Sequence, residues 1–351
     1  MRISILIKNN KLAFKSLLSL ARKSKSAKFI QFEADDKILA TAFHPEMQIT
    51  LVLQGEITEQ GTSIIPLDLI EKGLKTSILN IEDDVISFGE EPDGLFGKPN
   101  FTDVAFTQGT IDVNFYGNDT HLENGLGDGL NVNQALEITS ALKNACKFLD
   151  KEEVKLKVNG VFFDAKNQTI ASTDGFRLFT QKLSFKFADE NALIPSEIIP
   201  FLTENLIGSC AYISKNYLNI QSPTSRYSVL LLQDQFPDYI KVLPQEKEMR
   251  ELPLSIKAKQ AIYETEKLIE TNEIKIDLDD SDRMKLSSGS YEWIENRLEG
   301  KTKAVNFNIN HLTQILALTD HVYYSTNKYF ANSPFLFKRE NVRIMLMPNK
   351  D

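Results

Sequence analysis

The chain has 351 residues, with 40 Lys and Arg against 48 Asp and Glu, which gives a formal net charge of −8. Hydrophobic residues make up 42% and charged residues 25%, ordinary proportions for a globular protein that exclude a disordered, collagen-like or disulfide-built chain. Because domains usually contain ~100–200 residues, this length predicts two or three of them.

Basic residues gather at the beginning of the chain although the total charge is acidic. The first 32 residues contain eight Lys and Arg and no Asp or Glu. A helix is expected over 9–21, where Phe14 and Leu17 fall on one side at helical spacing and Lys11 and Lys15 fall on the other. Because phosphate binding needs a basic surface, this distribution keeps nucleic acid open as a partner.

Three segments of the sequence share one order of elements, in which an amphipathic helix precedes two strands, a second helix and further strands. The first segment predicts helix 9–21, strands 27–34 and 37–43, helix 64–74, and strands 78–84 and 85–91. The second predicts helix 133–149, strands 154–165 and 169–175, helix 193–206, and strands 210–216, 217–223 and 226–233. The third predicts helix 255–269, strands 273–280 and 284–290, helix 310–318, and strands 334–340 and 341–348.

Internal repetition at ~115–130 residues indicates repeated domains rather than a solenoid, whose units have about 20–50 residues. Strand pairs that alternate with single helices predict an α+β fold with helices on one face of antiparallel sheets. Composition changes at the Gly-rich stretch 125–129 and at the charged stretch 243–253. We therefore predict three tandem similar domains, at residues 1–127, 128–250 and 251–351.

The first helices of the second and third segments also carry lysines. On any one helix, exposed lysines can simply keep a surface solvated. Their recurrence in three repeats of an otherwise acidic chain favours one continuous positive surface. No aromatic residues interleave with them, which favours contact with the backbone of duplex DNA over base stacking on a single strand. The predicted DNA-binding residues are Lys11, Lys15, Arg22, Lys23, Lys25, Lys143, Lys147, Lys155, Lys157, Lys257 and Lys259.

Four short motifs follow one another in the second segment. They are VNG at Val158–Gly160, STDGFRL at Ser172–Leu178, IPSEII at Ile194–Ile199 and FPDYIKVLP at Phe236–Pro244, and the sequence ends in MLMPNKD. In this order and spacing, on a threefold repeat, they resemble the β subunit of bacterial DNA polymerase III, the family of sliding clamps.

This resemblance implies the DNA-clamp fold, in which helices line the interior of a ring and antiparallel sheets form its outside. It implies a head-to-tail homodimer that encircles double-stranded DNA without reading its sequence, has no catalytic residue and needs no cofactor. The implied partners are the DNA polymerase III catalytic subunit, the clamp-loader ATPase complex, and other polymerases and repair proteins. A specialised clamp of a phage or plasmid, with altered partners, is the alternative within the same family.

The resemblance also implies a pocket that captures short peptide motifs of these partners. An apolar wall accepts the Leu or Phe anchors of a peptide, and a few polar groups fix its register. Phe176 stands where the family usually has His or Tyr, which makes this part of the wall more apolar. The residues carried over to the wall are Val158, Thr173, Gly175, Phe176, Arg177, Leu178, Pro237, Lys241, Val242, Met345, Leu346, Met347 and Pro348.

For the dimer interface we expect Ile262 and Tyr263 of the third domain to meet the last strand of a partner's first domain, near Phe101 and Phe106. The closing residues Asn349, Lys350 and Asp351 differ from the basic and apolar ending that the family usually has.

Two other classes of function are weighed against a clamp. An enzyme could use the carboxylate and guanidinium of Asp174 and Arg177, but no nucleophile–base pair accompanies them. A scaffold of repeated domains that never meets DNA would not need cationic helices in each repeat. The tethering function is therefore favoured.

The remaining candidate sites are weak. The acidic cluster Asp277, Asp279, Asp280 and Asp282 lacks the Gly and the distal Glu of an EF-hand loop, and no metal site is predicted. The Gly-rich stretch 125–129 is no phosphate-binding loop, because no Lys-Ser or Lys-Thr follows it. Two cysteines, Cys146 and Cys210, and no apolar run of membrane-spanning length lead us to expect a cytoplasmic protein without a membrane partner.

Overall fold

The structure is a computed structural model that describes residues 1–25, 28–90, 101–105, 129–149, 159–202, 206–214, 216–269, 271–279, 283–294, 298, 302–325 and 330–349. The chain forms two compact units, each assembled from two separate stretches of sequence. Unit 1 comprises Met1–Thr139 with Glu197–Leu231, and unit 2 comprises Ser140–Ser196 with Leu232–Asp351. Helix α3 (Val132–Ala145) spans the point at which the chain first passes from one unit to the other.

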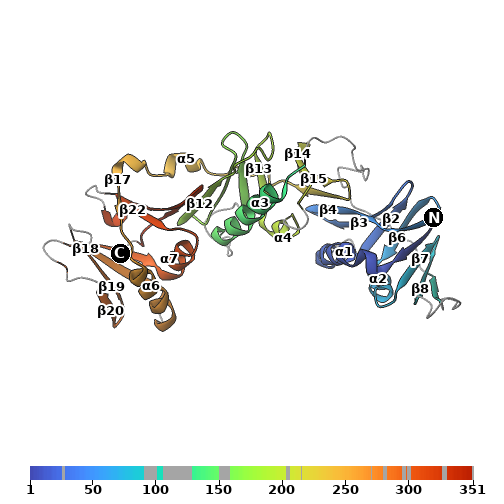
Figure 1. The fold of residues 1–351 in the computed structure, drawn as a ribbon, viewed down its shortest axis with the longest axis horizontal. Helices are drawn as coiled ribbons and strands as arrows, with labels where there is room; N and C mark the ends of the chain where they lie inside the picture. Colours follow the sequence, from blue (N-terminus) through green and yellow to red (C-terminus); the bar gives the residue numbers. More distant parts are fainter. Residues whose placement is uncertain are drawn as a thin grey trace. The chain divides into compact units, whose positions relative to one another are not determined.

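Unit 1 contains two antiparallel sheets (Figure 1). The strand order β5-β1-β7-β8-β9 is built from β1 (Arg2–Leu6), β5 (Gly55–Glu59), β7 (Ile78–Glu82), β8 (Val85–Gly89) and β9 (Phe101–Ala105). The order β14-β15-β16-β4-β3-β2-β6 is built from β2 (Phe29–Ala34), β3 (Ile38–His44), β4 (Met47–Leu53), β6 (Gly61–Pro66), β14 (Cys210–Ser214), β15 (Tyr217–Ser222) and β16 (Ser225–Leu230). The helical elements are η1 (Ile7–Asn10), α1 (Lys11–Lys23), α2 (Leu67–Gly73) and α4 (Ile199–Leu202).

Helix α1 packs its apolar side against the seven-stranded sheet. Phe14 and Leu17 are buried, whereas Lys11 and Lys15 on the other side are exposed, as the helical spacing predicted. Buried and half-buried residues alternate along β2, where Ile30, Phe32 and Ala34 are buried. Figure 1 shows α1 and α2 on the same side of β2, β3 and β6.

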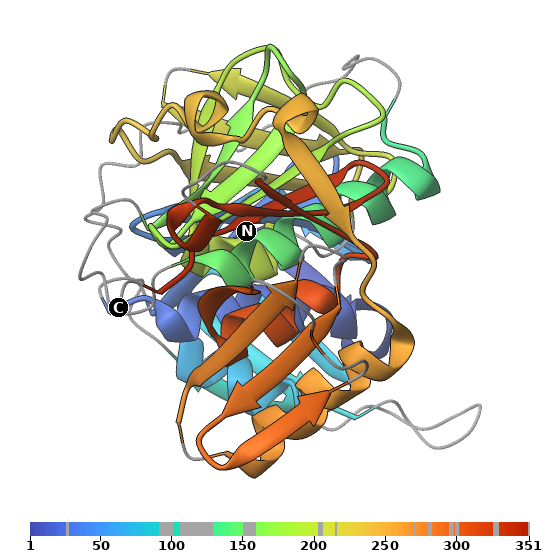
Figure 2. The same ribbon diagram turned by 90° about the vertical axis from the view of Figure 1, so that its left-hand side faces the viewer.

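Unit 2 has the same plan. Its eight-stranded antiparallel sheet, in the order β13-β10-β11-β12-β24-β23-β22-β17, is built from β10 (Gly160–Asp164), β11 (Thr169–Thr173), β12 (Arg177–Lys182), β13 (Ala192–Pro195), β17 (Met249–Leu252), β22 (His321–Ser325), β23 (Phe335–Arg339) and β24 (Val342–Leu346). Its four-stranded sheet, in the order β20-β19-β18-β21, is built from β18 (Glu273–Asp279), β19 (Met284–Ser288), β20 (Tyr291–Ile294) and β21 (Thr302–Asn308). Figure 2 shows these four strands side by side in orange.

The helical elements of unit 2 besides α3 are short, with one exception. They are η2 (Cys146–Phe148), α5 (Tyr239–Val242), η4 (Glu246–Glu248), α6 (Ile256–Leu268), α7 (Ile309–Leu316) and η5 (Phe330–Asn332). The turn η3 (Ser196–Ile198) begins at the last residue of the first stretch of unit 2 and continues into unit 1. Helices α6 and α7 pack against each other (Figure 1). Ser255 caps the start of α6, since its hydroxyl accepts a hydrogen bond from the backbone N–H of Ala258, and Asn308 caps α7 in the same way through His311.

One order of elements recurs three times along the chain, which confirms the predicted α+β fold of similar repeats. Helices α1, α3 and α6 precede the strand triplets β2–β4, β10–β12 and β18–β20, and helices α2, α4 and α7 precede the triplets β7–β9, β14–β16 and β22–β24. The boundaries at residues 127/128 and 250/251 stay predictions.

Strands from different repeats pair within each unit. In unit 1, β4 of the first repeat pairs with β16 of the second, with Thr50 opposite Arg226. In unit 2, β12 of the second repeat pairs with β24 of the third, with Leu178 opposite Met345. Each of the two large sheets is therefore continuous across a junction between repeats.

Candidate functional site

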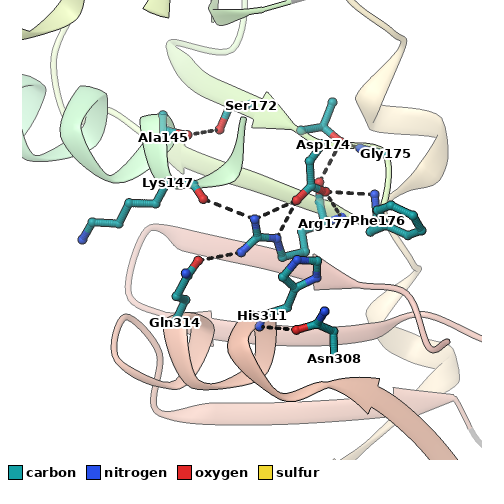
Figure 3. Close-up of polar contacts among 11 residues, drawn as sticks. Ala145, Lys147, Ser172, Asp174, Gly175, Phe176, Arg177, Asn308, His311 and Gln314 are labelled. Atoms are coloured by element: carbon teal, nitrogen blue, oxygen red, sulfur yellow. Dashed lines mark hydrogen bonds and ion pairs between the residues drawn. The ribbon is translucent and has the colours of Figure 1, made fainter. Parts of the chain in front are cut away.

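A tight turn joins β11 to β12 in unit 2 and is held by its own side chains (Figure 3). The carboxylate Oδ1 of Asp174 accepts hydrogen bonds from the backbone N–H groups of Phe176 (2.9 Å) and Arg177 (2.7 Å). The hydroxyl of Thr173 donates to the carbonyl oxygen of Arg177 at 2.7 Å. Gly175 has φ +85°, a left-handed conformation that a residue without Cβ adopts at little cost. The sequence Thr-Asp-Gly-Phe-Arg thus specifies this turn locally.

Arg177 is buried, with 5% of its surface exposed, and each of its three guanidinium nitrogens donates a hydrogen bond. It forms an ion pair with Asp174 at 2.7 Å, donates to the side-chain oxygen of Gln314 on α7 at 2.7 Å, and donates to the carbonyl oxygen of Lys147 at 3.3 Å. The guanidinium carbon also lies 4.9 Å from the centre of the Phe148 ring. Charge, hydrogen bonds and stacking together compensate for the burial of this cation.

Strand alternation separates the residues of this region onto two faces of the eight-stranded sheet. Arg177 and Leu346 are directly opposite each other and share the face towards α7 and η2, as the contacts of Arg177 establish. Leu178 and Met345, the next pair along the two strands, therefore point to the other face, and so does Thr173, the partner of Leu178 on β11.

That other face carries an apolar cluster. Phe162 on β10 stacks on Phe236 with ring centres 4.9 Å apart and planes 7° from parallel. The buried members are Ala171, Leu178, Leu193, Phe236, Tyr239 and Met345, and the half-buried members are Phe162, Leu232, Leu243 and Met347. Each large apolar side chain that is fully buried here contributes roughly 1.5–3 kcal/mol to the stability of the fold, and the half-buried members contribute less.

The segment 232–243, which includes α5, lies over this cluster, and the backbone N–H of Leu232 donates to the carbonyl oxygen of Leu193 on β13 at 2.9 Å. The hydroxyl of Tyr239 donates to Oδ2 of Asp164 at 2.8 Å. Burial, the hydrogen bond and the negative charge of Asp164 raise the pKa of Tyr239. Burial works against ionisation of Asp164, but hydrogen bonds from Asn167 and Tyr239 outweigh it and lower the pKa of this carboxyl group.

Exposed apolar side chains border the cluster. Phe176, which is 41% exposed, follows the turn, and Ile240 and Val242, which are 54% and 52% exposed, lie on α5. The backbone N–H of Met347 donates to the carbonyl oxygen of Phe176 at 2.9 Å, so the half-buried Met347 lies beside the turn. A surface of this kind, apolar and framed by polar groups, can accept the apolar anchors of a peptide.

His311, near the start of α7, lies beside Phe176, and their ring centres are 6.4 Å apart. Burial and the positive charge of Arg177 lower the pKa of His311, whereas the charge of Asp174 works in the opposite direction. The imidazole is therefore favoured in its neutral form next to the exposed Phe176 ring.

The residues expected to form the peptide pocket come from the second and third repeats, and unit 2 contains the described ones. Leu178, Met345 and Met347 belong to the apolar cluster, Pro237, Lys241 and Val242 lie on the segment over it, and Thr173, Gly175 and Phe176 form the turn beside it. Arg177 and Leu346 point to the opposite face, and Pro348 is buried. Val158 lies outside the described residues.

The sequence did not identify several members of the cluster. Phe162, Leu193 and Leu232 lie outside the motifs used for the pocket or at their edges, and Phe236 and Tyr239 lie inside one but were not selected. A signal existed in the composition of this segment, because Phe236 and Tyr239 are the aromatic residues of a motif already assigned to the pocket.

The basic residues of the candidate DNA surface are exposed, with one exception. Lys11, Lys15, Arg22, Lys23 and Lys25 in unit 1 are exposed, as are Lys143, Lys147 and Lys257. Lys259 is half-buried, and its ammonium group donates to the carbonyl oxygen of Asp320 at 3.2 Å. Arg22 is paired with Glu71 at 2.7 Å, and the ammonium group of Lys23 lies 4.8 Å from the centre of the Phe201 ring. Lys155 and Lys157 lie outside the described residues.

The described residues among the four expected at a dimer interface differ in how far they are exposed. Ile262 is fully buried inside unit 2, so its side chain is not available to a second copy. Tyr263 is half-buried and donates to the carbonyl oxygen of Thr313 at 3.4 Å. Phe101 is 39% exposed and begins β9, an edge strand among those described in its sheet. Phe106 lies outside the described residues.

Polar side chains lie across the middle of the seven-stranded sheet of unit 1. Thr41, Thr50 and Arg226 stand opposite one another there on β3, β4 and β16. The hydroxyls of Thr41 and Thr50 are 3.0 Å apart, and Ser228 donates to the side-chain oxygen of Asn219 at 2.7 Å. The two large sheets therefore share the order of seven corresponding strands, and the sheet of unit 1 carries polar cross-strand contacts at this place.

Among the residues described, no three His, Cys, Asp or Glu side chains are grouped so that they could hold a metal ion. In the same part of the chain, no helix combines the length and the apolar character needed to span a membrane.

No protein-family model and no curated protein matches the chain. Solved structures match it over 100% of both chains. A DNA polymerase sliding clamp from Pseudomonas aeruginosa with a ligand has 14% identity and a TM-score of 0.78. The β clamp of Helicobacter pylori bound to a DNA ligase peptide has 17% identity and a TM-score of 0.72. A sliding clamp from Bartonella birtlesii bound to griselimycin has 16% identity and a TM-score of 0.76. The chain has the fold of these sliding clamps, as the motifs predicted.

Proposed function

We propose that the protein is a DNA sliding clamp, a ring of two copies that encircles duplex DNA and tethers DNA polymerase III and other DNA-processing proteins. The observation that carries the proposal is the pairing of strands between successive repeats, β4 with β16 and β12 with β24. Likeness over the full chain to bacterial sliding clamps supports it.

Ring closure follows from continuing this series of junctions. The strand of the third repeat that corresponds to β4 and β12 is β20, and the strand of the first repeat that corresponds to β16 and β24 is β9. Both are edge strands among the described strands of their sheets. Pairing of β20 with β9 of a second copy, and the reverse, closes a head-to-tail dimer and covers edges that would otherwise invite aggregation.

Exposed apolar side chains on these two edges favour such a contact. Ile294 on β20 is 52% exposed, and Phe101 on β9 is 39% exposed. The third repeat therefore contributes β20 to the proposed interface, with Tyr263 on the nearby α6 as a secondary element and the buried Ile262 behind it.

The solution mass tests the dimer. The wild-type chain is expected at about twice its chain mass of 39.8 kDa in sedimentation equilibrium or light scattering. Ile294→Asp places a charge in the apolar contact and is expected to shift the population towards monomer. Ile240→Asp, a change at a similarly exposed site on α5, serves as the control and leaves the mass unchanged. A monomeric wild-type chain would overturn ring closure.

The tethering mechanism is topological. Exposed lysines on α1, α3 and α6 make salt-sensitive contacts with phosphates, which alone give weak binding. A closed ring converts these contacts into long retention, because leaving requires ring opening or a DNA end. No catalytic residue is needed for this role.

Retention on DNA tests the topology directly. Protein loaded onto nicked circles by a clamp-loader ATPase complex is expected to stay far longer than protein on linear fragments of the same length. Cutting the circles after loading is expected to release it. Equal release from circles and linear fragments would contradict the proposed mechanism.

The apolar cluster of unit 2 with its bordering side chains is the proposed docking site for partner peptides. Leu or Phe anchors of a peptide would cover Met347, Phe162 and Leu243, which are half-buried in the free protein. The DNA polymerase III catalytic subunit, the clamp-loader complex and repair proteins are the partners that we propose for this site.

Peptide affinity tests this assignment. The DNA ligase peptide of the Helicobacter pylori complex is used as the probe in fluorescence anisotropy with the full chain. Replacing Met347 and Pro348 by Ala is expected to abolish binding while the dimer mass is retained. Met249→Ala on β17, where the side chain is also half-buried, is the matched control. Unchanged affinity of the double variant would exclude this site.

A further inference from the structure

Arg177 connects three elements of unit 2 that are distant in the sequence (Figure 3). Its guanidinium pairs with Asp174 in the turn, donates to Gln314 on α7, and donates to the carbonyl oxygen of Lys147 in η2. The partner Gln314 is 137 residues away in the sequence, in the third repeat. A single side chain therefore links the turn beside the proposed docking site to two helical elements on the opposite face of the sheet.

The helical end at η2 needs such a donor. The last carbonyl groups of a helix have no partner within the helix, and the end of the helix carries partial negative charge. Here Ser172 donates to the carbonyl oxygen of Ala145 at 2.7 Å, and Arg177 supplies both a donor and a positive charge at Lys147. The end of α3 and η2 is thus fixed against β11 and β12 through side chains of the turn region.

The turn itself depends on the same ion pair. One carboxylate oxygen of Asp174 accepts hydrogen bonds from the backbone N–H groups of Phe176 and Arg177. The other oxygen accepts a hydrogen bond from the guanidinium of Arg177. Without the guanidinium, the second oxygen would be buried and unpaired, which favours rearrangement of the turn. Because the carbonyl oxygen of Phe176 accepts from the backbone N–H of Met347, a rearranged turn would also release the segment after β24.

We propose that Arg177 is a positioning residue of the docking site, and this inference rests on the proposed function. It holds the turn and the adjoining Met347 in the arrangement that receives a peptide, and it does so from the opposite face of the sheet without touching the peptide. The site is thereby organised before binding, which lowers the entropic cost of association.

The first test replaces Arg177 by Lys, which keeps the positive charge but cannot reach three acceptors at once. The expected result is an affinity for the Helicobacter pylori DNA ligase peptide that is roughly tenfold weaker, on the scale of one lost charge-assisted hydrogen bond. Gln314→Leu, which removes only the link to α7, is expected to have a smaller effect in the same direction.

A matched control exists in the same unit. Arg283, which directly precedes β19, is tied to Asp279 at the end of β18 by a similar pair of bonds, since its backbone N–H and its Nε donate to the carboxylate of Asp279 at 3.0 and 2.6 Å. Arg283→Lys is expected to lower stability and to leave peptide affinity unchanged. If Arg283→Lys weakened peptide binding as much as Arg177→Lys does, the effect would be a general loss of stability and the proposal would fail.

A second measurement does not depend on a ligand. Hydrogen exchange of the Phe176, Arg177 and Met347 amides is expected to accelerate in Arg177→Lys, whereas exchange in the β10–β13 pair stays at the wild-type rate. Unchanged exchange at the turn would overturn the positioning role even if affinity fell.

Contact and positioning are separated by varying the peptide. If Arg177 binds the peptide directly, Arg177→Lys should change the affinity of a probe with an acidic residue differently from that of its neutral counterpart. The positioning role predicts equal losses for both probes. Failure of the wild-type chain to bind any probe would count against the proposed docking site itself, whereas normal binding by Arg177→Lys counts only against this inference.

Discussion

The hydroxyl of Tyr239 donates a 2.8 Å hydrogen bond to the carboxylate of Asp164, a residue 75 positions earlier in the sequence. This bond connects α5 to the end of β10 and fixes the segment that covers the apolar cluster. The rings of Phe162 and Phe236 stack beside it, so polar and aromatic contacts together hold the same segment on the sheet.

Removing the Tyr239 hydroxyl tests the contribution of that bond. Tyr239→Phe keeps the ring in the cluster but deprives Asp164 of a donor, so we expect the free energy of unfolding to fall by about 1–2 kcal/mol. Urea denaturation of the full chain measures this change. Tyr217→Phe on β15 is the control, and an equal loss there would show that the Asp164 bond has no special weight.

The same pair predicts a dependence on pH at the acid end. The pKa of Asp164 in the folded protein is lowered from 3.8, so its contribution to stability is present above that value and is lost as the pH falls through the folded pKa. In Tyr239→Phe one of the hydrogen bonds that lower the pKa is absent, and stability is expected to fall less steeply with acid. Denaturation midpoints at a series of pH values below 5 provide the measurement.

His311 predicts a second dependence nearer to neutral pH. Its pKa in the folded protein is lowered from 6.5 by burial and by Arg177, so the unfolded chain binds the proton more readily. Stability is therefore expected to decline as the pH falls below 6.5, down to the folded pKa. His311→Gln should remove this part of the pH profile, and an unaltered profile would mean that another group is responsible.

Gly175 predicts a local cost of adding a side chain. At φ +85° an L-residue is strained, so Gly175→Ala is expected to lower stability by about 1–2 kcal/mol. Gly175→Asn should cost less, because Asn tolerates left-handed conformations better than Ala does. Thermal unfolding of the two variants provides the comparison, and the reverse order would argue against a backbone origin of the effect.

The exposed lysines of α1 predict a salt dependence of binding to DNA. Each phosphate contact contributes about 0.9 to the slope of log affinity against log salt concentration. Lys15→Ala is therefore expected to reduce the slope by about that amount on a short duplex. Lys186→Ala, at an exposed lysine paired with Asp189 outside the three helices, should leave the slope unchanged. Equal slopes for the wild type, Lys15→Ala and Lys186→Ala would show that Lys15 makes no contact with DNA phosphates.

Local patterns predicted much of the fold. The apolar stripe of α1 was identified from the spacing of Phe14 and Leu17, because a helix surface repeats within a few residues. The threefold order of elements was identified for the same reason. One helix was expected over residues 193–206. The structure instead has β13, which ends at Pro195, followed by the single turn η3 and the short helix α4 (Ile199–Leu202). A short apolar run before a proline suits a strand end as well as a helix start.

Pairing between repeats could not be predicted from periodicity. The hydrophobic periodicity near Leu178 does not identify Met345 as its neighbour, because cross-strand contacts depend on the register of the whole sheet, and only the family resemblance brought the two together. For the same reason the motif placed Arg177 in the pocket wall, whereas the register turns it towards α7. The turn that holds it, by contrast, is encoded within five consecutive residues.

The junction between β12 and β24 also has a consequence for the order in which the protein is made. Thr180 on β12 bonds to the carbonyl oxygen of Arg343, 163 residues later, so the nascent chain must carry β12 as an open edge until that late strand has been synthesised. At a synthesis rate of about 5–20 residues per second, the 163 residues between the two strands take roughly 8–33 seconds. During that time the apolar cluster lacks Met345 and the half-sheet is exposed to other chains. The strand that brings Met345 to the proposed docking site therefore also ends this period of exposure.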